Sequence, residues 1–159
     1  PVGPAQRLAG EEGQVLLLGV GTVALVAALL LVVATATSVY LDLKHLTSLA
    51  DSAAAAAADS VDYSSYYGSG VSPGAPGALT DQVVIETAQE DLGSQLRAQD
   101  GRAGGLGDVR ISQAYAQDAG TAVVTLTARS QPPFLPWGIL PSGGFTLTAT
   151  GSAAVTSRP

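Results

Sequence analysis

The chain has 159 residues, the size of one ordinary domain, and carries 13 acidic against 7 basic residues, for a net charge of −6. Such a chain lacks the basic surface that supplies most of the affinity for nucleic acid, so we exclude nucleic acid as a partner. The absence of cysteine excludes disulfides and thiolate chemistry.

After a short N-terminal lead (1–12), an apolar run is long enough to cross a membrane. Val15 to Ala34 contains twenty residues without a charge, and Thr22 is its only polar side chain. At about 1.5 Å rise per residue, a helix of this length spans a hydrocarbon core of roughly 30 Å. A chain this small could hardly cover such a helix on every side, which disfavours a buried helix of a soluble protein. Basic residues are too evenly divided around the span to set its orientation.

Small residues predict that this helix packs closely against other helices. Within the span, a neighbouring backbone could approach at Gly19, Gly21, Ala24 and Ala28, although ordinary membrane composition explains these residues equally well. Beyond it, an a/d stripe with spacing 4, 3, 4, 3, 4 is formed by Val39, Leu43, Leu46, Ala50, Ala53 and Ala57. The pattern predicts one transmembrane and stalk helix over 13–60, about 70 Å long.

The C-terminal half predicts a small α+β head over 79–159, after a linker loop (61–78) rich in Gly, Pro and Ser. Thr80 is the expected N-cap of a second helix. Its apolar face consists of Val84, Ile85, Ala88, Leu92 and Leu96.

Period-two alternation then predicts three half-buried antiparallel strands. Each strand places one apolar set on a single side: Val109, Ile111 and Tyr115; Val124, Leu126 and Ala128; and Phe145, Leu147 and Ala149. The predicted fold is therefore α+β: a long N-terminal transmembrane and stalk helix, then one helix on a roughly three-stranded antiparallel sheet.

Residues suited to catalysis or metal binding are scarce. His45 is the only histidine, and a zinc site needs three or four His, Cys or carboxylate ligands. We interpret His45 as a solvated side chain at the membrane boundary. The carboxylates of the second helix, Glu86, Glu90 and Asp91, are typical of a solvated acidic face. The sequence therefore predicts a non-enzymatic protein with no catalytic residues, no metal and no cofactor.

The segment Gln131 to Gly144 is the least ordinary loop, with four prolines. It either folds back over the head or presents an apolar contact to a partner. The contact would be formed by Phe134, Leu135, Trp137, Ile139 and Leu140.

Two stretches carry a resemblance to a known family. "EEGQVLLLGVG" precedes the apolar helix, and "YLDLKHLTSLADSAAAAAA" follows it. Together they resemble the N-terminal segment of TadE/TadG-like proteins of Tad (Flp) pilus systems, most like the actinobacterial ones. The match covers about fifty residues, roughly Glu11 to Ser60. The matching positions are Gly13, Gln14, Asp42, Leu46, Ala50, Asp51, Ala53 and Ala54.

The resemblance implies a pseudopilin or minor pilin, with its N-terminus in the cytoplasm and its head outside. It implies as partners other copies of the chain or other pilin-like subunits, the pilus assembly machinery, and the lipid bilayer before assembly. Type IV pilins are typically cut after a glycine, and Gly10 is the candidate processing site.

Our leading expectation is a structural subunit of a pilus or its assembly machinery, associating through its N-terminal helix. One alternative is a single-pass membrane-anchored binding module that grips a partner through the Phe134–Leu140 loop. Another is the repeating main subunit of an extracellular filament. In the leading case, replacing Ala50, Ala53 or Ala57 with Leu is expected to impair assembly while leaving the head folded.

Overall fold

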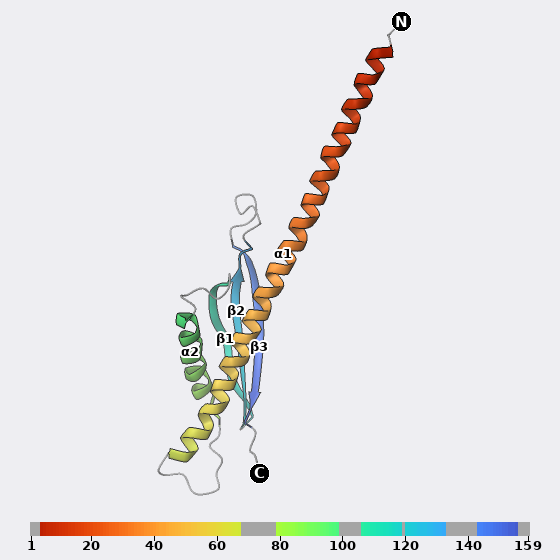
Figure 1. Cartoon of the computed structure of the whole chain (residues 1–159). Helices are drawn as coiled ribbons and strands as arrows, with labels where there is room; N and C mark the ends of the chain where they lie inside the picture. Colours follow the sequence, from red (N-terminus) through yellow and green to blue (C-terminus); the bar gives the residue numbers. More distant parts are fainter. Residues whose placement is uncertain (1–3, 68–78, 99–105, 119, 133–142, 156–159) are drawn as a thin grey trace. The chain divides into compact units, whose positions relative to one another are not determined.

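The structure is a computed structural model that describes residues 4–67, 79–98, 106–118, 120–132 and 143–155, with side chains of the first helix described over 13–60. The predicted α+β fold is confirmed: a long N-terminal helix, one further helix and a three-stranded antiparallel sheet. The elements follow in the order α1 (Pro4–Tyr67), α2 (Asp81–Ala98), β1 (Leu106–Asp118), β2 (Thr121–Ser130) and β3 (Phe145–Ala154) (Figure 1).

The chain divides into two compact units, Pro1–Ser38 and Val39–Pro159, and α1 contributes residues to both. This division differs from the prediction, which began the head at residue 79. The second part of α1 belongs to the head unit because its alanine face is buried there. The helix also extends beyond the predicted 13–60 at both ends, and its start at Pro4 fits the preference of proline for the first helical turn.

Four threonine hydroxyls along α1 are satisfied within the helix itself. Thr22 donates to the Leu18 carbonyl oxygen at 2.8 Å, and Thr35 does the same to Leu31. Two further threonines, at positions 37 and 47, each donate to the carbonyl oxygen four residues earlier at 2.9 Å. These threonines therefore expose no unpaired hydroxyl donor, which removes much of their cost in a medium without water.

The sheet has the order β1–β2–β3, with both neighbouring pairs antiparallel. The β2–β3 register is unbroken from Thr121 opposite Ala154 to Ser130 opposite Phe145. The β1–β2 register instead shifts at three places along β1. Each shift adds one residue to β1, which explains why β1 has 13 residues where β2 has 10.

These bulges decide which side chains of β1 face the core. The first bulge, between Gly107 and Arg110, places Val109 against the core and Arg110 opposite Thr127 on the outer face. The second, between Ile111 and Gln113, places Tyr115 opposite Val123, where it is 41% exposed. The predicted grouping of Tyr115 with Val109 and Ile111 is therefore wrong, because one extra residue reverses the alternation that follows it.

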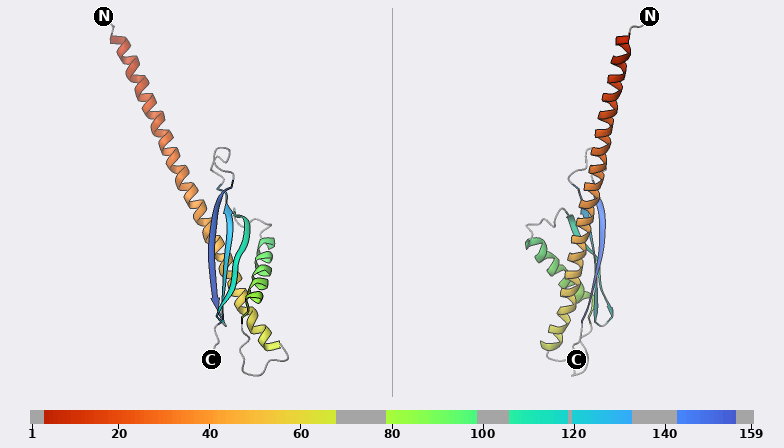
Figure 2. Two further views of the ribbon diagram at one scale, coloured as in Figure 1. Left: turned by 180° about the vertical axis from the view of Figure 1, so that it is seen from behind. Right: turned by 45° about the vertical axis from the view of Figure 1, so that its right-hand side comes forward.

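The core of the head lies between one face of the sheet and the two helices. From α2, Val84, Ala88 and Leu92 are buried as predicted, whereas Ile85 is 38% exposed. α2 packs against β1 and β2 (Figure 2). Its first residue, Asp81, accepts a hydrogen bond from the Ala116 amide of β1 at 2.8 Å, which holds the start of α2 beside the β1–β2 turn.

Candidate membrane and assembly helix

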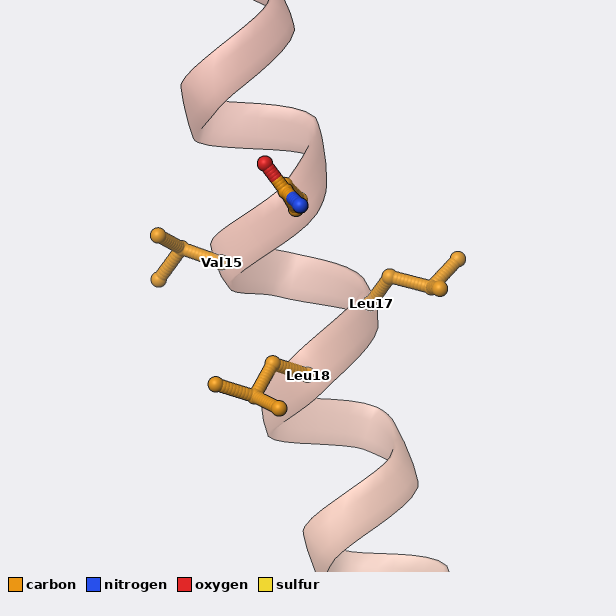
Figure 3. Close-up of a pocket in the computed structure, with 4 residues that line it drawn as sticks. Val15, Leu17 and Leu18 are labelled. Atoms are coloured by element: carbon orange, nitrogen blue, oxygen red, sulfur yellow. The ribbon is translucent and has the colours of Figure 1, made fainter.

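The first part of α1 presents an apolar surface on every side. Its thirteen Leu and Val side chains between Val15 and Val33 are each 50–77% exposed. Figure 3 shows Val15, Leu17 and Leu18 projecting from the ribbon in different directions, and the hollow that they line with Gln14 is an open surface of a single helix. Among the described residues, α1 is the one helix long and apolar enough to cross a membrane.

The exposure of so many apolar side chains is too unfavourable for water to be the native environment of this segment. Burying one large aliphatic side chain is worth about 1.5 kcal/mol or more. Thirteen such side chains therefore favour transfer of this segment into an apolar environment by about 20 kcal/mol. The segment therefore requires lipid or other protein around it.

The small residues predicted for helix packing form two separate sites on this segment. Successive residues of an α-helix are rotated by about 100°, so Gly21, Ala24 and Ala28 share one face and Gly19 lies on the opposite side. All four are exposed, and no atom lies within 4 Å of a Cβ placed at Gly19 or Gly21. Only Gly21, Ala24 and Ala28 can therefore form one continuous contact, and we call them the small-residue stripe.

The predicted stripe in the second part of α1 is already occupied by the head of the same chain. Leu46, Ala50, Ala53 and Ala57 are each 0% exposed and belong to the core cluster. The expectation that this stripe contacts other helices is wrong for these four residues. Of the two remaining members of that stripe, Val39 is half-buried and Leu43 is 37% exposed.

Gly151 of β3 explains why alanine suits this helix. A Cβ at Gly151 would lie 2.5 Å from the Asp51 amide nitrogen and closer still to the Ala50 carbonyl group. The backbones of α1 and β3 therefore touch, with no side chain between them. A thin helix face and a strand glycine together permit this approach, whereas a leucine stripe would hold the helix farther from the sheet.

A buried polar pair fixes α1 against the end of β2. Ser130 is 0% exposed and its hydroxyl donates to the Asp42 carboxylate, which is itself 5% exposed. Asp42 is not a member of the apolar stripe, and it is nevertheless buried. Its burial is tolerated because the hydrogen bond from Ser130 compensates part of the cost of desolvation.

His45 follows Asp42 by one helical turn, and its Nε2 atom is buried with no hydrogen-bond partner in the described part of the chain. The interpretation of His45 as a solvated side chain is therefore wrong for its Nε2 atom. A single imidazole does not make a metal site, and the described residues contain no group of three or more His, Cys, Asp or Glu that could hold a metal ion.

A second polar contact joins the two helices. The Gln95 amide donates to Ser52 Oγ at 2.9 Å and to Asp91 Oδ2 at 2.5 Å, and the Ser52 hydroxyl lies 3.4 Å from the same carboxylate oxygen. Asp91 thus contributes to helix packing, whereas Glu86 and Glu90 are exposed as expected. The solvated acidic face predicted for α2 is correct for two of its three carboxylates.

Two predicted sites cannot be compared with side-chain positions. The apolar loop contact, Phe134, Leu135, Trp137, Ile139 and Leu140, lies outside the described residues. Gly10 falls within α1, and its role in processing stays a prediction. Searches among protein-family models, curated proteins and solved structures found nothing that matches this chain.

Proposed function

We propose that the chain is a structural subunit of a Tad-type pilus or its assembly machinery, anchored in the membrane by the first part of α1 with its head outside. One observation carries the proposal: a single helix exposes apolar side chains in its first part and supplies the core of the head in its second. This arrangement is expected of a pilin-like subunit, in which one helix contributes residues to both the anchor and the head.

Assembly would exchange the lipid around the first part of α1 for neighbouring protein helices. In the bilayer, lipid tails cover the side chains between Val15 and Val33. In a fibre, neighbouring helices must cover the same surface, because water cannot. The stripe formed by Gly21, Ala24 and Ala28 is the face at which another backbone can approach most closely. The buried face of the second part, Leu46, Ala50, Ala53 and Ala57, does not take part, since the head of its own chain already covers it.

A matched pair of variants tests the exchange. Gly21→Leu adds a large side chain to the stripe, and Gly19→Leu makes the same change on the opposite side of the helix. Neither clashes within the chain. We expect Gly21→Leu to lower the amount of the chain in sheared extracellular fibres by about tenfold, with Gly19→Leu close to wild type. Both variants should remain in the membrane fraction of unsheared cells.

Mass spectrometry of the sheared material measures this directly. Equal loss of both variants from the fibres would show that a large side chain is harmful on either side of the helix. No loss of either variant would show that the small-residue stripe is not needed for assembly. Recovery of the wild-type chain only from membranes would instead support the alternative of a membrane-anchored binding module.

A further inference from the structure

Basic side chains of the head gather at the end of the sheet that lies beside Asp42. Arg129 directly precedes Ser130, the partner of Asp42, and pairs with Thr146 of β3. Arg110 pairs with Thr127. The two arginines, with Asp108, Thr127, Ala128 and Thr146, line a hollow of about 160 Å³ on the outer face of the sheet.

The bulge in β1 creates this arrangement. Asp108 adopts a left-handed conformation with φ of 50°, and the extra residue turns Arg110 outward while Val109 turns toward the core. Without the bulge, Arg110 would face the core. Arg110 and Arg129 become diagonal neighbours on one face, roughly 7–8 Å apart at their Cα atoms. Because both arginines line the same hollow, their like charges favour an anion between them.

The charge at the hollow is only partly neutralised. Arg110 lies 3.7 Å from Asp108, and both side chains are highly exposed, so solvent screens the pair strongly. No acidic side chain in the described part of the chain pairs with Arg129. Two guanidinium groups and the hydroxyls of Thr127 and Thr146 therefore remain to donate hydrogen bonds, which is the donor set that phosphate accepts.

The position of the hollow along the chain points to the source of the phosphate. The uncharged run Val15–Leu41 has 27 residues and is about 40 Å long as a helix, close to the thickness of a bilayer with both headgroup layers. Asp42 is the first charged residue after that run, so chain connectivity alone places it at the headgroups. The hydrogen bond from Ser130 to Asp42 then brings Arg129, the neighbour of Ser130, close to Asp42.

Acidic side chains gather at the opposite end of the head. Asp118 lies at the β1–β2 turn, Asp81 is held beside it through the Ala116 amide, and Asp59 lies nine residues beyond Ala50 along α1. The end beside the hollow also carries Asp108 and the buried Asp42, but the exposed Lys44 adds a third basic side chain there, so an anionic surface favours this end over the acidic one. This uneven distribution of charge would keep the acidic end of the head away from the membrane.

We propose that the hollow between Arg110 and Arg129 binds the phosphate of an anionic phospholipid in the membrane that anchors the chain. The proposal rests on the membrane anchor proposed above. Binding would seat the head against the bilayer before assembly, and extraction into a fibre would require its release. The site would thus add electrostatic attraction between the head and the membrane to the burial of the apolar helix in lipid.

The test uses the full chain in vesicles of phosphatidylcholine, with and without phosphatidylglycerol. Because the chain has no cysteine, Thr148→Cys and Ala154→Cys each introduce a single labelling position. Thr148 pairs with Thr127 beside the hollow, and Ala154 lies at the acidic end. A fluorophore at position 148 should be quenched by headgroup-linked quencher lipids only when phosphatidylglycerol is present, whereas one at 154 should not respond.

Three substitutions test whether the contact with phosphatidylglycerol depends on the hollow. Arg129→Gln should weaken headgroup occupancy about fivefold, as expected for one basic side chain at an anionic surface. Arg97→Gln is the matched control, since it makes the same charge change on α2 outside the hollow. Asp108→Asn should increase occupancy by a similar factor, and asparagine suits the left-handed conformation at this position. A gain at position 148 with no gain at position 154 is not expected from unfolding, which would bring both labels to the bilayer.

Four outcomes would overturn the proposal. The first is equal weakening by Arg97→Gln and Arg129→Gln, which would indicate a general charge effect. The second is quenching that depends on the ratio of protein to lipid, which would indicate contact with a second copy. The third is complete displacement by inorganic phosphate, which would indicate a site for free phosphate. The fourth is the same quenching at position 148 in neutral vesicles. Failure of the chain to float with vesicles would instead contradict the membrane anchor.

Discussion

Replacing Gly151 with alanine tests whether α1 and β3 touch through their backbones. The added Cβ would lie 2.5 Å from the Asp51 amide nitrogen, where ordinary contact needs at least 3.5 Å. Because backbone lies on both sides, no side chain can rotate away. The helix must retreat by about 1 Å, which loosens the contacts of Ala50 and its buried neighbours.

Overpacking of this kind costs typically 1–3 kcal/mol, and the rigid surroundings favour the upper end. For a head of this size the Tm should fall by about 4 °C per kcal/mol, or roughly 10 °C in all. The assay is thermal unfolding of the full chain in detergent micelles, followed by circular dichroism. Gly120→Ala is the control, because a Cβ there meets no atom within 4 Å. Equal Tm values for the two variants would refute the close approach of α1 to β3.

Three further predictions concern the head. Ala53→Leu adds a large side chain to a position that is 0% exposed, so it should lower the Tm of the isolated chain by several degrees and impair folding itself, contrary to what the sequence pattern implied. Ser130→Ala leaves the buried Asp42 carboxylate without its donor and should destabilise the head by about 1–3 kcal/mol in denaturant unfolding; Asp42→Asn in the same background should restore part of the loss, and no restoration would contradict the pairing. The Gly120 amide donates to Asp118 at 3.0 Å and, with the Thr121 hydroxyl, lowers the pKa of that carboxyl. Its stabilising effect is therefore present above the ordinary pKa of about 3.9 and lost as pH falls through the lower pKa of the folded state; Asp118→Asn should remove this small acid-dependent change in Tm.

Much of the fold could be predicted from periodicity. The uncharged run from Val15 to Ala34 and the alanines after it favour helix whatever surrounds them. Val124, Leu126 and Ala128 alternate with polar residues, and the structure buries these three as one face of β2. Such signals are local, because each depends only on which side chains recur at the spacing of a helix or a strand.

The rest could not be predicted, because it depends on which surfaces meet. The spacing of Ala50, Ala53 and Ala57 marks a buried face without identifying its partner, and the sheet of the same chain is as good a partner as another helix. Because Gly151 has no side chain, it contributes nothing to a hydrophobic pattern, although it sets the distance between α1 and β3. The bulge between Ile111 and Gln113 reverses Tyr115, and nothing in the local alternation of side chains reveals it.

The buried Asp42 shows a further limit. Its charge argues for solvent, and only the position of Ser130, 88 residues away, makes its burial tolerable. The same hydrogen bond brings Arg129, the neighbour of Ser130, close to Asp42. The proposed lipid site could therefore not be seen in the sequence, because its residues come together only through the register of the sheet.

The measurement that most directly tests the central claim is a scan of single cysteines along α1 in the full chain, reconstituted into vesicles and labelled with a spin probe. Accessibility to oxygen dissolved in the lipid and to a water-soluble nickel chelate would be recorded at each position. We predict that Leu17, Leu25 and Leu31 report lipid, and that Ala50 and Ala53 report neither lipid nor water. Lipid contact at Ala50 and Ala53, or protection from lipid at Leu25, would contradict a helix that serves as anchor in one part and as core of the head in the other.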